Sequence, residues 1–343
     1  MIRRPPRSTP SNSSAASDVY KRQNHSGVND EIFSEEKIPY FSWILDNPFY
    51  HINESSKSSY AYFLVMDKSY INELAHYGIE NVFYLPPASN PERMHIMGRT
   101  TLRQMDISLL DNLERPCNEW RKERLREAKP PTREILDLLV HLKIQKPRMT
   151  FDEMFSFCDE KFQFKILQKL DMKARGSIEF RIDAETTAYF KENCLASLKK
   201  YKITVYGDKE WRKINASNIY YAGSVDYASC AGNIYRASNV NLNIIPAHFQ
   251  TGINPRLLDI AATGAIFLTT PSKFIQDFFD LDLKYLIFHS ENDLAEKAEY
   301  FLKSREIRTM VGNELFESVY HKHTYEHRIK ELLNIFEQIK PRL

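Results

Sequence analysis

Short, unbroken apolar runs that alternate with helix-like segments constrain the fold of this 343-residue chain more than any other feature. The runs span residues 38–45, 60–66, 81–85, 202–206, 219–222, 239–245, 265–269 and 285–288. Strands made of continuous apolar residues are typical of parallel sheets, because helices cover both faces of such sheets. The pattern therefore predicts an α/β protein with two doubly wound sheets, one in each half of the chain.

The segment between the two halves has a different character. Residues 90–200 are rich in charge and are interrupted by prolines at positions 116, 130, 131 and 147. Residues 106–110 suit a strand, whereas residues 132–142 and 151–170 suit helices. We therefore expect a helical insertion between the two sheets.

A helix over residues 324–339 is expected to close the chain. Its apolar stripe consists of Ile329, Leu332, Leu333, Phe336 and Ile339, so we expect it to pack across both halves. The expected organisation is a disordered segment at 1–23, a first domain at 24–105, a helical connecting region at 106–200, a second domain at 201–322 and a C-terminal helix at 323–343.

Residues 1–23 are rich in Ser, Pro and Arg and show no apolar periodicity, so we expect them to be disordered. Their composition also suits an organelle transit peptide. The string more closely resembles translated adapter or vector sequence, which would make it foreign to the fold. Without its five basic residues and one acidic residue, totals of 47 and 45 become 42 and 44. This body has no basic excess, so we expect no nucleic-acid partner.

Four widely spaced cysteines, at positions 117, 158, 194 and 230, form no CxxC pair. They indicate neither a disulfide framework nor a zinc site, and they favour a reducing, cytoplasmic location. No apolar run approaches the roughly 20 residues that cross a bilayer, so we expect no transmembrane segment.

The most informative segment covers residues 251–264. Asn254 is a preferred N-cap, Pro255 fits the first helical position and Gly264 suits the residue after a helix. The start of a helix presents unpaired N–H groups and the positive end of its dipole, which suit a phosphate. Gly252 leaves room for a ligand to approach the backbone closely.

Two charged side chains add to this pattern. Arg256 lies in the first turn, where its guanidinium could bind a diphosphate through two hydrogen bonds. Asp259 lies three residues further on the same face, and its carboxylate could accept hydrogen bonds from two ribose hydroxyls. The alternative is an ordinary Arg–Asp ion pair on a helix, and the spacing alone does not separate the two interpretations.

The same stretch resembles the C-terminal domain of the CgeB-like (spore maturation protein) glycosyltransferases, which have the GT-B fold. Further matching motifs lie, in order, at 43–48, 84–88, 205–211, 223–227, 234–243 and 323–328. The resemblance implies two Rossmann-like domains that face a cleft, with a nucleotide-sugar on the second domain and an acceptor on the first. It assigns nucleotide-sugar contacts to Gly207, Tyr235, Gly252, Ile253, Asn254, Arg256 and Asp259.

The chain departs from the family pattern in two places. The family usually has Glu at the position of Asp259, and the shorter Asp side chain reaches less far. GT-B N-terminal domains open with a strand and a glycine-containing loop, and nothing before Ile38 matches them. We therefore expect a truncated N-terminal domain, which would leave the isolated chain inactive even if its gene encodes an enzyme.

Asp46 and His51 follow a predicted strand, and cleft residues of open α/β sheets collect at such positions. Either side chain could act as the general base for the acceptor. The alternative for Asp46 is a cap of the turn that precedes Pro48.

These patterns predict a metal-independent, hexosyltransferase-like enzyme without a cofactor, whose acceptor is a saccharide, a protein or a cell-surface precursor. Two alternatives are a non-catalytic binding or assembly protein with a degenerate transferase-like domain, and a nucleotide-sugar epimerase of the GT-B fold. Residues 323–327 match H-x-x-E-H and residues 280–282 match D-x-D, which are both metal-binding patterns. We expect no metal at either pattern. The histidines of residues 323–327 should be polar residues near the domain junction, and the acids of residues 280–282 should be a solvated pair.

Overall fold

The structure, a computed structural model, describes residues 30–96, 104–113, 130–158 and 171–339. Its strands are β1 (Tyr40–Ile44), β2 (Ala61–Val65), β3 (Val82–Tyr84), β4 (Met105–Leu110), β5 (Ile203–Tyr206), β6 (Ile219–Gly223), β7 (Ser238–Asn243) and β8 (Phe267–Thr269). Its α-helices are α2 (Asp30–Glu35), α3 (Ser69–His76), α4 (Pro91–Ile96), α6 (Pro130–Gln145), α7 (Phe151–Ser156), α9 (Met172–Ser197), α10 (Tyr227–Ala237), α11 (Pro255–Ala261), α12 (Ile275–Phe279), α13 (Glu291–Lys303), α14 (Arg305–Lys322) and α15 (Tyr325–Ile339). Three short 3-10 helices are η1 (Pro48–Tyr50), η2 (Glu54–Lys57) and η3 (Lys209–Lys213).

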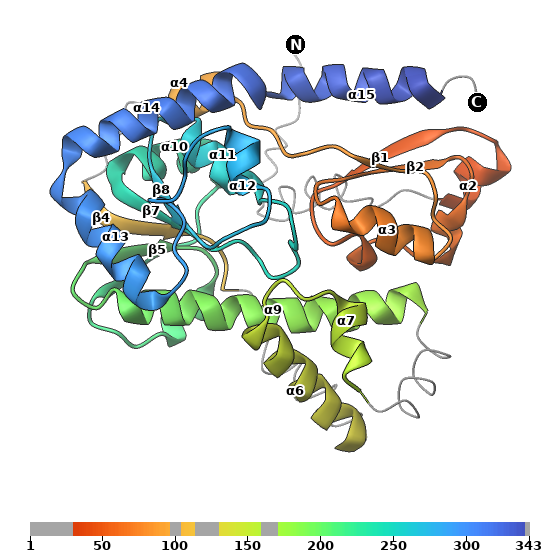
Figure 1. Cartoon of the computed structure of the whole chain (residues 1–343), viewed down its shortest axis with the longest axis horizontal. Coiled ribbons are helices and arrows are strands. Elements are labelled where there is room, and N and C mark those ends of the chain that lie inside the picture. Colours follow the sequence, from red (N-terminus) through yellow and green to blue (C-terminus); the bar gives the residue numbers. More distant parts are fainter. Residues whose placement is uncertain (1–29, 97–103, 114–129, 159–170, 340–343) are drawn as a thin grey trace, which may run out of the picture.

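The first unit, residues 30–89, is built on a three-stranded parallel sheet in the order β1-β2-β3. All five residues of β2 are buried, because this strand lies between the other two and both of its faces are covered. Parallel strands end at the same edge of a sheet, so the loops after β1, β2 and β3 lie together. Figure 1 places this unit beside a second α/β unit.

The second unit, residues 104–113 and 201–322, contains a parallel sheet in the order β6-β5-β4-β7-β8. The chain builds this sheet outward from β4 in one direction and then from β7 in the other, which is the Rossmann-like arrangement. The two directions meet between β4 and β7, which are hydrogen-bonded neighbours. This point is where open α/β sheets bind their ligands.

The placement of β4 corrects the expected connecting region at 106–200. Residues 105–110 do form a strand, but that strand is the centre of the second sheet, paired with β5 and β7. The register of β4 buries its last four residues on both faces, so it belongs to a core rather than to a connection. The helices α6, α7 and α9 therefore interrupt the second unit after its first strand.

The 26-residue helix α9 joins the two units. Figure 1 shows it running beneath both sheets, and it packs against η1 of the first unit and α13 of the second. Asp171 caps its start by accepting a hydrogen bond from the Ala174 amide at 2.7 Å. At Gly176 the helix approaches η1 so closely that a Cβ atom would lie 1.7 Å from the Phe49 carbonyl oxygen.

Three further segments either differ from the secondary structure expected for them or include residues outside the described part of the chain. Residues 285–288 make only an isolated bridge, Thr269↔Ile287, because a hydrogen-bonded turn at 283–287 replaces the strand. The helix expected at 151–170 ends at Ser156 as α7, and residues 159–170 lie outside the described part. Residues 1–23 also lie outside it.

The C-terminal helix α15 runs above the first unit in Figure 1. Ile329 and Leu333 of its apolar stripe are 56% and 57% exposed, whereas Arg328 is buried. The helix is thus anchored by Arg328 and by Ile339, the buried end of the same apolar stripe. No helix within the described ranges has the length and apolar character needed to cross a membrane.

The close approach of α9 to η1 predicts that Gly176→Ala destabilises the protein. The added methyl group would meet backbone rather than a flexible side chain, and overpacking of this kind typically costs about 1–3 kcal/mol. Urea unfolding measures the loss. Ser177→Ala on the same helix removes only a hydroxyl bonded to the Lys173 carbonyl, and equal stability of the two variants would contradict the proposed contact.

Candidate functional site

The switch point of the second sheet is occupied by a buried ion cluster around Asp111. Asp111 directly follows β4, and its carboxylate lies 2.7 Å from Arg256 of α11 and 2.8 Å from Lys191 of α9. Its side chain is 3% exposed, whereas that of Arg256 is 29% exposed. The predicted site residue Arg256 therefore contacts Asp111 and still reaches the solvent.

Gly207 brings the end of β5 against the same carboxylate-bearing residue. A Cβ atom on Gly207 would lie 2.1 Å from the Asp111 carbonyl oxygen, so no larger residue fits without a backbone shift. Trp211 donates a 2.7 Å hydrogen bond to this carbonyl from its Nε1 atom. The predicted position Gly207 is thus part of the switch point.

The helix start at α11 forms where the sequence predicts it, with Asn254 at the N-cap position and Pro255 at the first helical position. The Asn254 side chain makes no capping hydrogen bond. Its amide instead exchanges two hydrogen bonds, of 3.0 and 3.1 Å, with Asn243 at the end of β7. Ile253 beside it is buried in the core. The predicted site residues Ile253 and Asn254 therefore fix the start of α11 through contacts with the protein interior.

Asp259 is buried, and other residues of the chain already bind both of its oxygens. Ser89 donates a 2.6 Å hydrogen bond to one oxygen, and the Tyr227 hydroxyl donates a 2.7 Å hydrogen bond to the other. Tyr235, also a predicted site residue, is buried and contacts the Tyr227 hydroxyl at 3.1 Å. Burial raises the pKa of Asp259 to about 6, although its hydrogen bonds and the nearby Arg256 act in the opposite direction.

Ser89 shows how the first unit reaches this cluster. Its backbone N–H donates to the His323 carbonyl at 3.0 Å, at the junction of α14 and α15. Arg328 of α15 donates to the carbonyls of Pro86 and Pro87 at 3.1 and 3.0 Å. The loop after β3 therefore lies between Asp259 and the C-terminal helix.

Residues of the two metal-like patterns, 323–327 and 280–282, have polar partners within the protein. One ring nitrogen of His323 lies 2.8 Å from the Phe278 carbonyl, and the other accepts a 2.7 Å hydrogen bond from Arg328. Both ring nitrogens therefore have partners within the protein. In the other metal-like pattern, Asp280 pairs with Lys322 and Asp282 pairs with Lys284 at the surface.

A small pocket lies between the two units beside this cluster. Its volume is about 140 Å³, and it is lined by Trp43, Leu45, Pro87, Ala88, Pro255 and Tyr325. The Trp43 and Tyr325 rings lie 6.4 Å apart in an edge-on arrangement. The pocket thus combines loops after β1 and β3 with the start of α11, which is where a two-domain cleft is expected.

The structure brings Asp46 and His51 together, with 3.7 Å between the Asp46 carboxylate and the His51 Nε2 atom. His51 lines a different groove, of about 480 Å³, between the loop after β1 and α9. The residues that line this groove are Phe49, Tyr50, His51, Ile52, Asn53, Lys173, Gly176, Ser177 and Phe180. The catalytic roles of Asp46 and His51 stay predictions.

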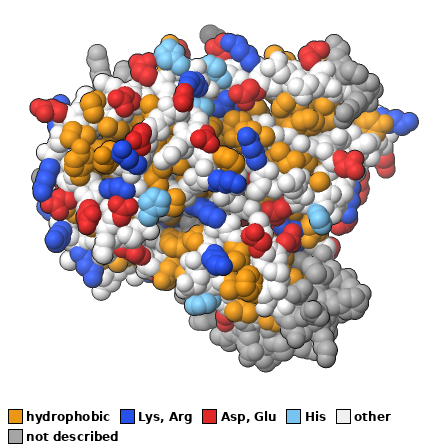
Figure 2. Space-filling view, in the orientation of Figure 1, with side chains coloured by type: hydrophobic (Ala, Val, Ile, Leu, Met, Phe, Trp, Pro, Cys, Tyr) orange, Lys and Arg blue, Asp and Glu red, His pale blue; other side chains and the backbone are white. Residues whose placement is uncertain are grey.

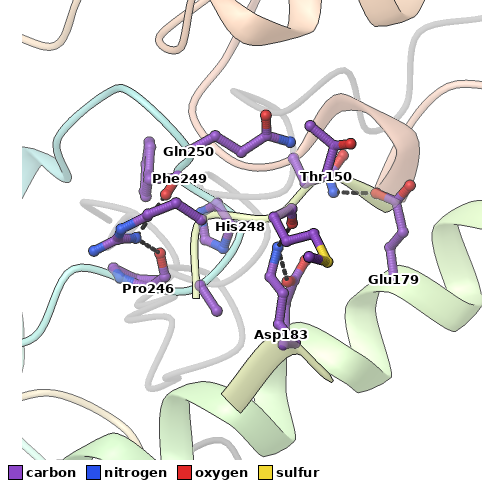
Figure 3. A network of polar contacts seen from close by, with 12 residues as sticks. Thr150, Glu179, Asp183, Pro246, His248, Phe249 and Gln250 are labelled. Atoms are coloured by element: carbon purple, nitrogen blue, oxygen red, sulfur yellow. Dashed lines mark hydrogen bonds and ion pairs between the residues drawn. The ribbon is translucent and has the colours of Figure 1, made fainter. Parts of the chain in front are cut away.

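The loop at 246–250, which leads into the site, is held by the first unit and by the helical insertion (Figure 3). Arg148 donates to the carbonyls of Pro246, Phe249 and Pro271 at 3.2, 2.6 and 2.8 Å. Tyr70 of α3 donates to the His248 carbonyl at 2.6 Å. The sequence offered no signal for these contacts, because their partners are 98 to 178 residues apart.

Charges of both signs are mixed on the surface. Figure 2 shows Lys and Arg side chains interspersed with Asp and Glu over the face in view.

Comparison with known proteins supports a transferase fold. Residues 188–334 match the model of a family described as glycosyl transferase-like. No curated protein matches the chain by sequence. The structure is similar to that of sucrose-phosphate synthase from Thermosynechococcus elongatus, with a TM-score of 0.50 and 11% identity over 89% of this chain and 68% of that one.

Two further structures also match, with lower TM-scores. They are a mutant of S. aureus TarM in complex with UDP, and T4 phage BGT in complex with UDP-glucose. TarM gives a TM-score of 0.47 at 13% identity over 87% of this chain, and the chain spans 50% of TarM. BGT gives a TM-score of 0.45 at 9% identity over 91% of this chain and 76% of its own. The similarity to the synthase, together with the two parallel sheets, confirms the predicted α/β, GT-B fold class.

The raised pKa of Asp259 predicts a pH-dependent contribution to stability. A folded-state pKa of about 6 against an ordinary 3.8 means that the fold favours the protonated carboxyl. The protonated Asp259 carboxyl makes its full contribution to the free energy of unfolding below about pH 4. This contribution is lost as the pH rises through 6, which lowers the free energy of unfolding by on the order of 3 kcal/mol. Asp259→Asn should therefore gain stability relative to the parent protein between pH 4 and 7.5.

Urea unfolding of both proteins across this pH range measures the effect. Asp277→Asn removes an exposed carboxylate from α12 and should show no such trend. A pH-independent difference between Asp259→Asn and the parent protein would contradict the assignment.

Proposed function

We propose that the chain is a glycosyltransferase that moves a sugar from a nucleotide-diphosphate sugar to an acceptor bound across the cleft. The observation that supports this most directly is the position of Arg256. It lies at the switch point of a Rossmann-like sheet, is oriented by buried Asp111 and remains partly exposed. The match of residues 188–334 to a glycosyl transferase-like family supports the same conclusion.

Arg256 would bind the donor diphosphate. A guanidinium carries five N–H donors in a planar fork, and the 2.7 Å contact with Asp111 holds the fork of Arg256 at the switch point. A guanidinium can form charge-assisted hydrogen bonds to phosphate oxygens. As the sugar leaves, negative charge grows on the diphosphate, and a fixed cation in a partly buried site stabilises it. We propose that this cation makes the reaction independent of a metal.

Asp259 would contact the ribose of the donor, with Gly207 and Tyr235 shaping the nucleotide side. Each carboxylate oxygen accepts two hydrogen bonds, and the contacts from Ser89 and Tyr227 use one on each oxygen. A ribose hydroxyl could therefore join Ser89 and Tyr227 without displacing them. Gly252, Ile253 and Asn254 would place the start of α11 for this contact.

The acceptor would approach from the first unit. The pocket beside Pro255 has room for about one six-membered ring, because a cavity of about 150 Å³ accommodates benzene. Its Trp43 and Tyr325 rings offer apolar surfaces to a saccharide ring. We propose as the general base either Asp46, which directly follows Leu45 of the pocket, or His51, which lies 3.7 Å from the Asp46 carboxylate in the neighbouring groove. The acceptor class, whether a saccharide, a protein or a cell-surface precursor, follows from the product test below.

We further propose membership of the CgeB-like group and a cytoplasmic location. The resemblance motifs at 205–211, 252–256 and 323–328 supply Trp211, Arg256 and Arg328 to one region around the switch point and the cleft. The wide spacing of the four cysteines supports a reducing compartment.

A non-catalytic binding protein is the second candidate, and the occupied oxygens of Asp259 favour it. Product analysis with nucleotide-sugar and a panel of acceptors separates the candidates. A new glycoside supports the transferase. Intact donor indicates the binding protein, and a free or epimerised sugar contradicts the transfer of a sugar.

The proposed donor site predicts that Arg256→Ala weakens binding of nucleoside diphosphates by about 1.5–3 kcal/mol, the value of a hydrogen bond to a charged group. Calorimetric titration with UDP, GDP and ADP measures this loss. Arg256→Lys keeps the charge but not the fork, and should recover only part of the affinity.

Arg305→Ala is the matched control, since Arg305 is exposed at the start of α14. Thermal unfolding checks that loss of the Asp111 contact leaves the variants folded. Equal affinity of the Arg256→Ala variant and the parent protein would overturn the assigned role.

A further inference from the structure

Three consecutive backbone N–H groups in the second unit point at a single oxygen atom. The amides of Gln250, Thr251 and Gly252 donate to the same Oδ2 atom of Asp67 at 2.7, 2.8 and 2.9 Å. The Thr251 hydroxyl donates to the other carboxylate oxygen, Oδ1. Successive N–H groups that converge in this way form an anion-binding concavity.

The anion in this concavity comes from the other unit. Asp67 is the second residue after β2, and Ser69 donates to its Oδ1 atom from a backbone N–H at 3.0 Å and from a hydroxyl at 2.7 Å. The Asp67 side chain is buried. Burial alone would raise the pKa of Asp67, but the hydrogen bonds from Thr251, Gly252 and Ser69 lower it below its ordinary value. The carboxylate is therefore charged at neutral pH.

The contact leaves no space for another anion while Asp67 is in place. A Cβ atom on Gly252 would lie 2.9 Å from the Met66 carbonyl and 3.3 Å from the Asp67 side chain. The loop after β2 thus lies directly on residues 250–252. A ligand that uses these N–H groups has to displace the carboxylate and separate the two loops.

The position of the concavity links it to the proposed donor site. Residues 250–252 run directly into Asn254 and Pro255, and Arg256 follows four residues after Gly252. A carboxylate and a phosphate present similar oxygens to N–H donors. Asp67 therefore has the chemistry of an internal competitor for a phosphate group.

We propose that the amides of residues 250–252 are a phosphate site that Asp67 occupies in this structure, and that the donor diphosphate displaces Asp67 and opens the contact between the two units. The proposal rests on the proposed function for the identity of the ligand. The N–H groups and the Thr251 hydroxyl would then bind one phosphate while Arg256 binds the diphosphate from the helix start. Asp67 would regulate the site by holding it closed when no donor is present.

Asp67→Asn tests the proposal, because the amide keeps the shape of the side chain and removes its charge. The weaker competitor should let the variant bind inorganic pyrophosphate at least about tenfold more tightly than the parent protein, as measured by calorimetry. Ser69→Ala removes one hydrogen bond that holds Asp67 and leaves the three N–H groups and the Thr251 hydroxyl intact, so it should give a smaller gain. Asp137→Asn removes an exposed carboxylate on α6 and should not change the affinity.

If Asp67 only joins the two units, pyrophosphate affinity will be unchanged or reduced in both Asp67→Asn and Ser69→Ala, and the proposal is overturned. The nucleoside diphosphates report separately on the proposed function. A tenfold gain for pyrophosphate without binding of UDP, GDP or ADP would keep the phosphate site and overturn the donor. Binding of a nucleoside diphosphate that depends on Arg256 but not on Asp67 would keep the proposed donor and overturn the phosphate site at residues 250–252.

Discussion

The buried carboxylate of Asp111 organises the second unit. An isolated carboxylate at this depth would cost several kcal/mol of solvation free energy, and the cations of Arg256 and Lys191 offset that cost. These cations come from α11 and α9, so the ion cluster draws both helices to the end of β4. Gly207 and Trp211 pack against the carbonyl of the same residue. One residue at the switch point thus sets the positions of two strands and two helices.

Directional polar contacts join the two units at three places. Asp67 binds the loop at 250–252, Ser89 binds Asp259 and Arg328 binds the loop after β3. Hydrogen bonds weaken steeply when their geometry changes. The relative placement of the units therefore depends on a few groups that a charged ligand could compete for. This dependence couples the proposed donor site to the separation of the units.

Helix α9 carries a second buried ion cluster, centred on Arg175. Arg175 is buried and pairs with Glu179 of its own helix and with Glu73 of α3. Burial raises the pKa of Glu179 to about 7, even though Arg175 acts in the opposite direction. A buried cluster of this kind is retained only when nearly every charge has a partner. It makes the helical insertion a structural link between the units.

The sequence by itself determined the elements whose signals are local. Continuous apolar runs predicted seven of the strands within two residues, and Asn254 with Pro255 predicted the start of α11, because strand burial and helix capping depend on neighbouring residues. Only the tertiary structure decided which partners those elements meet. It placed β4 in the second sheet, Arg256 on Asp111, Ser89 on Asp259 and Asp67 on residues 250–252. The side-chain contacts join residues 145 to 185 positions apart, and the pairing of β4 with β7 spans 133 positions. A chain reveals such pairings only after it has folded.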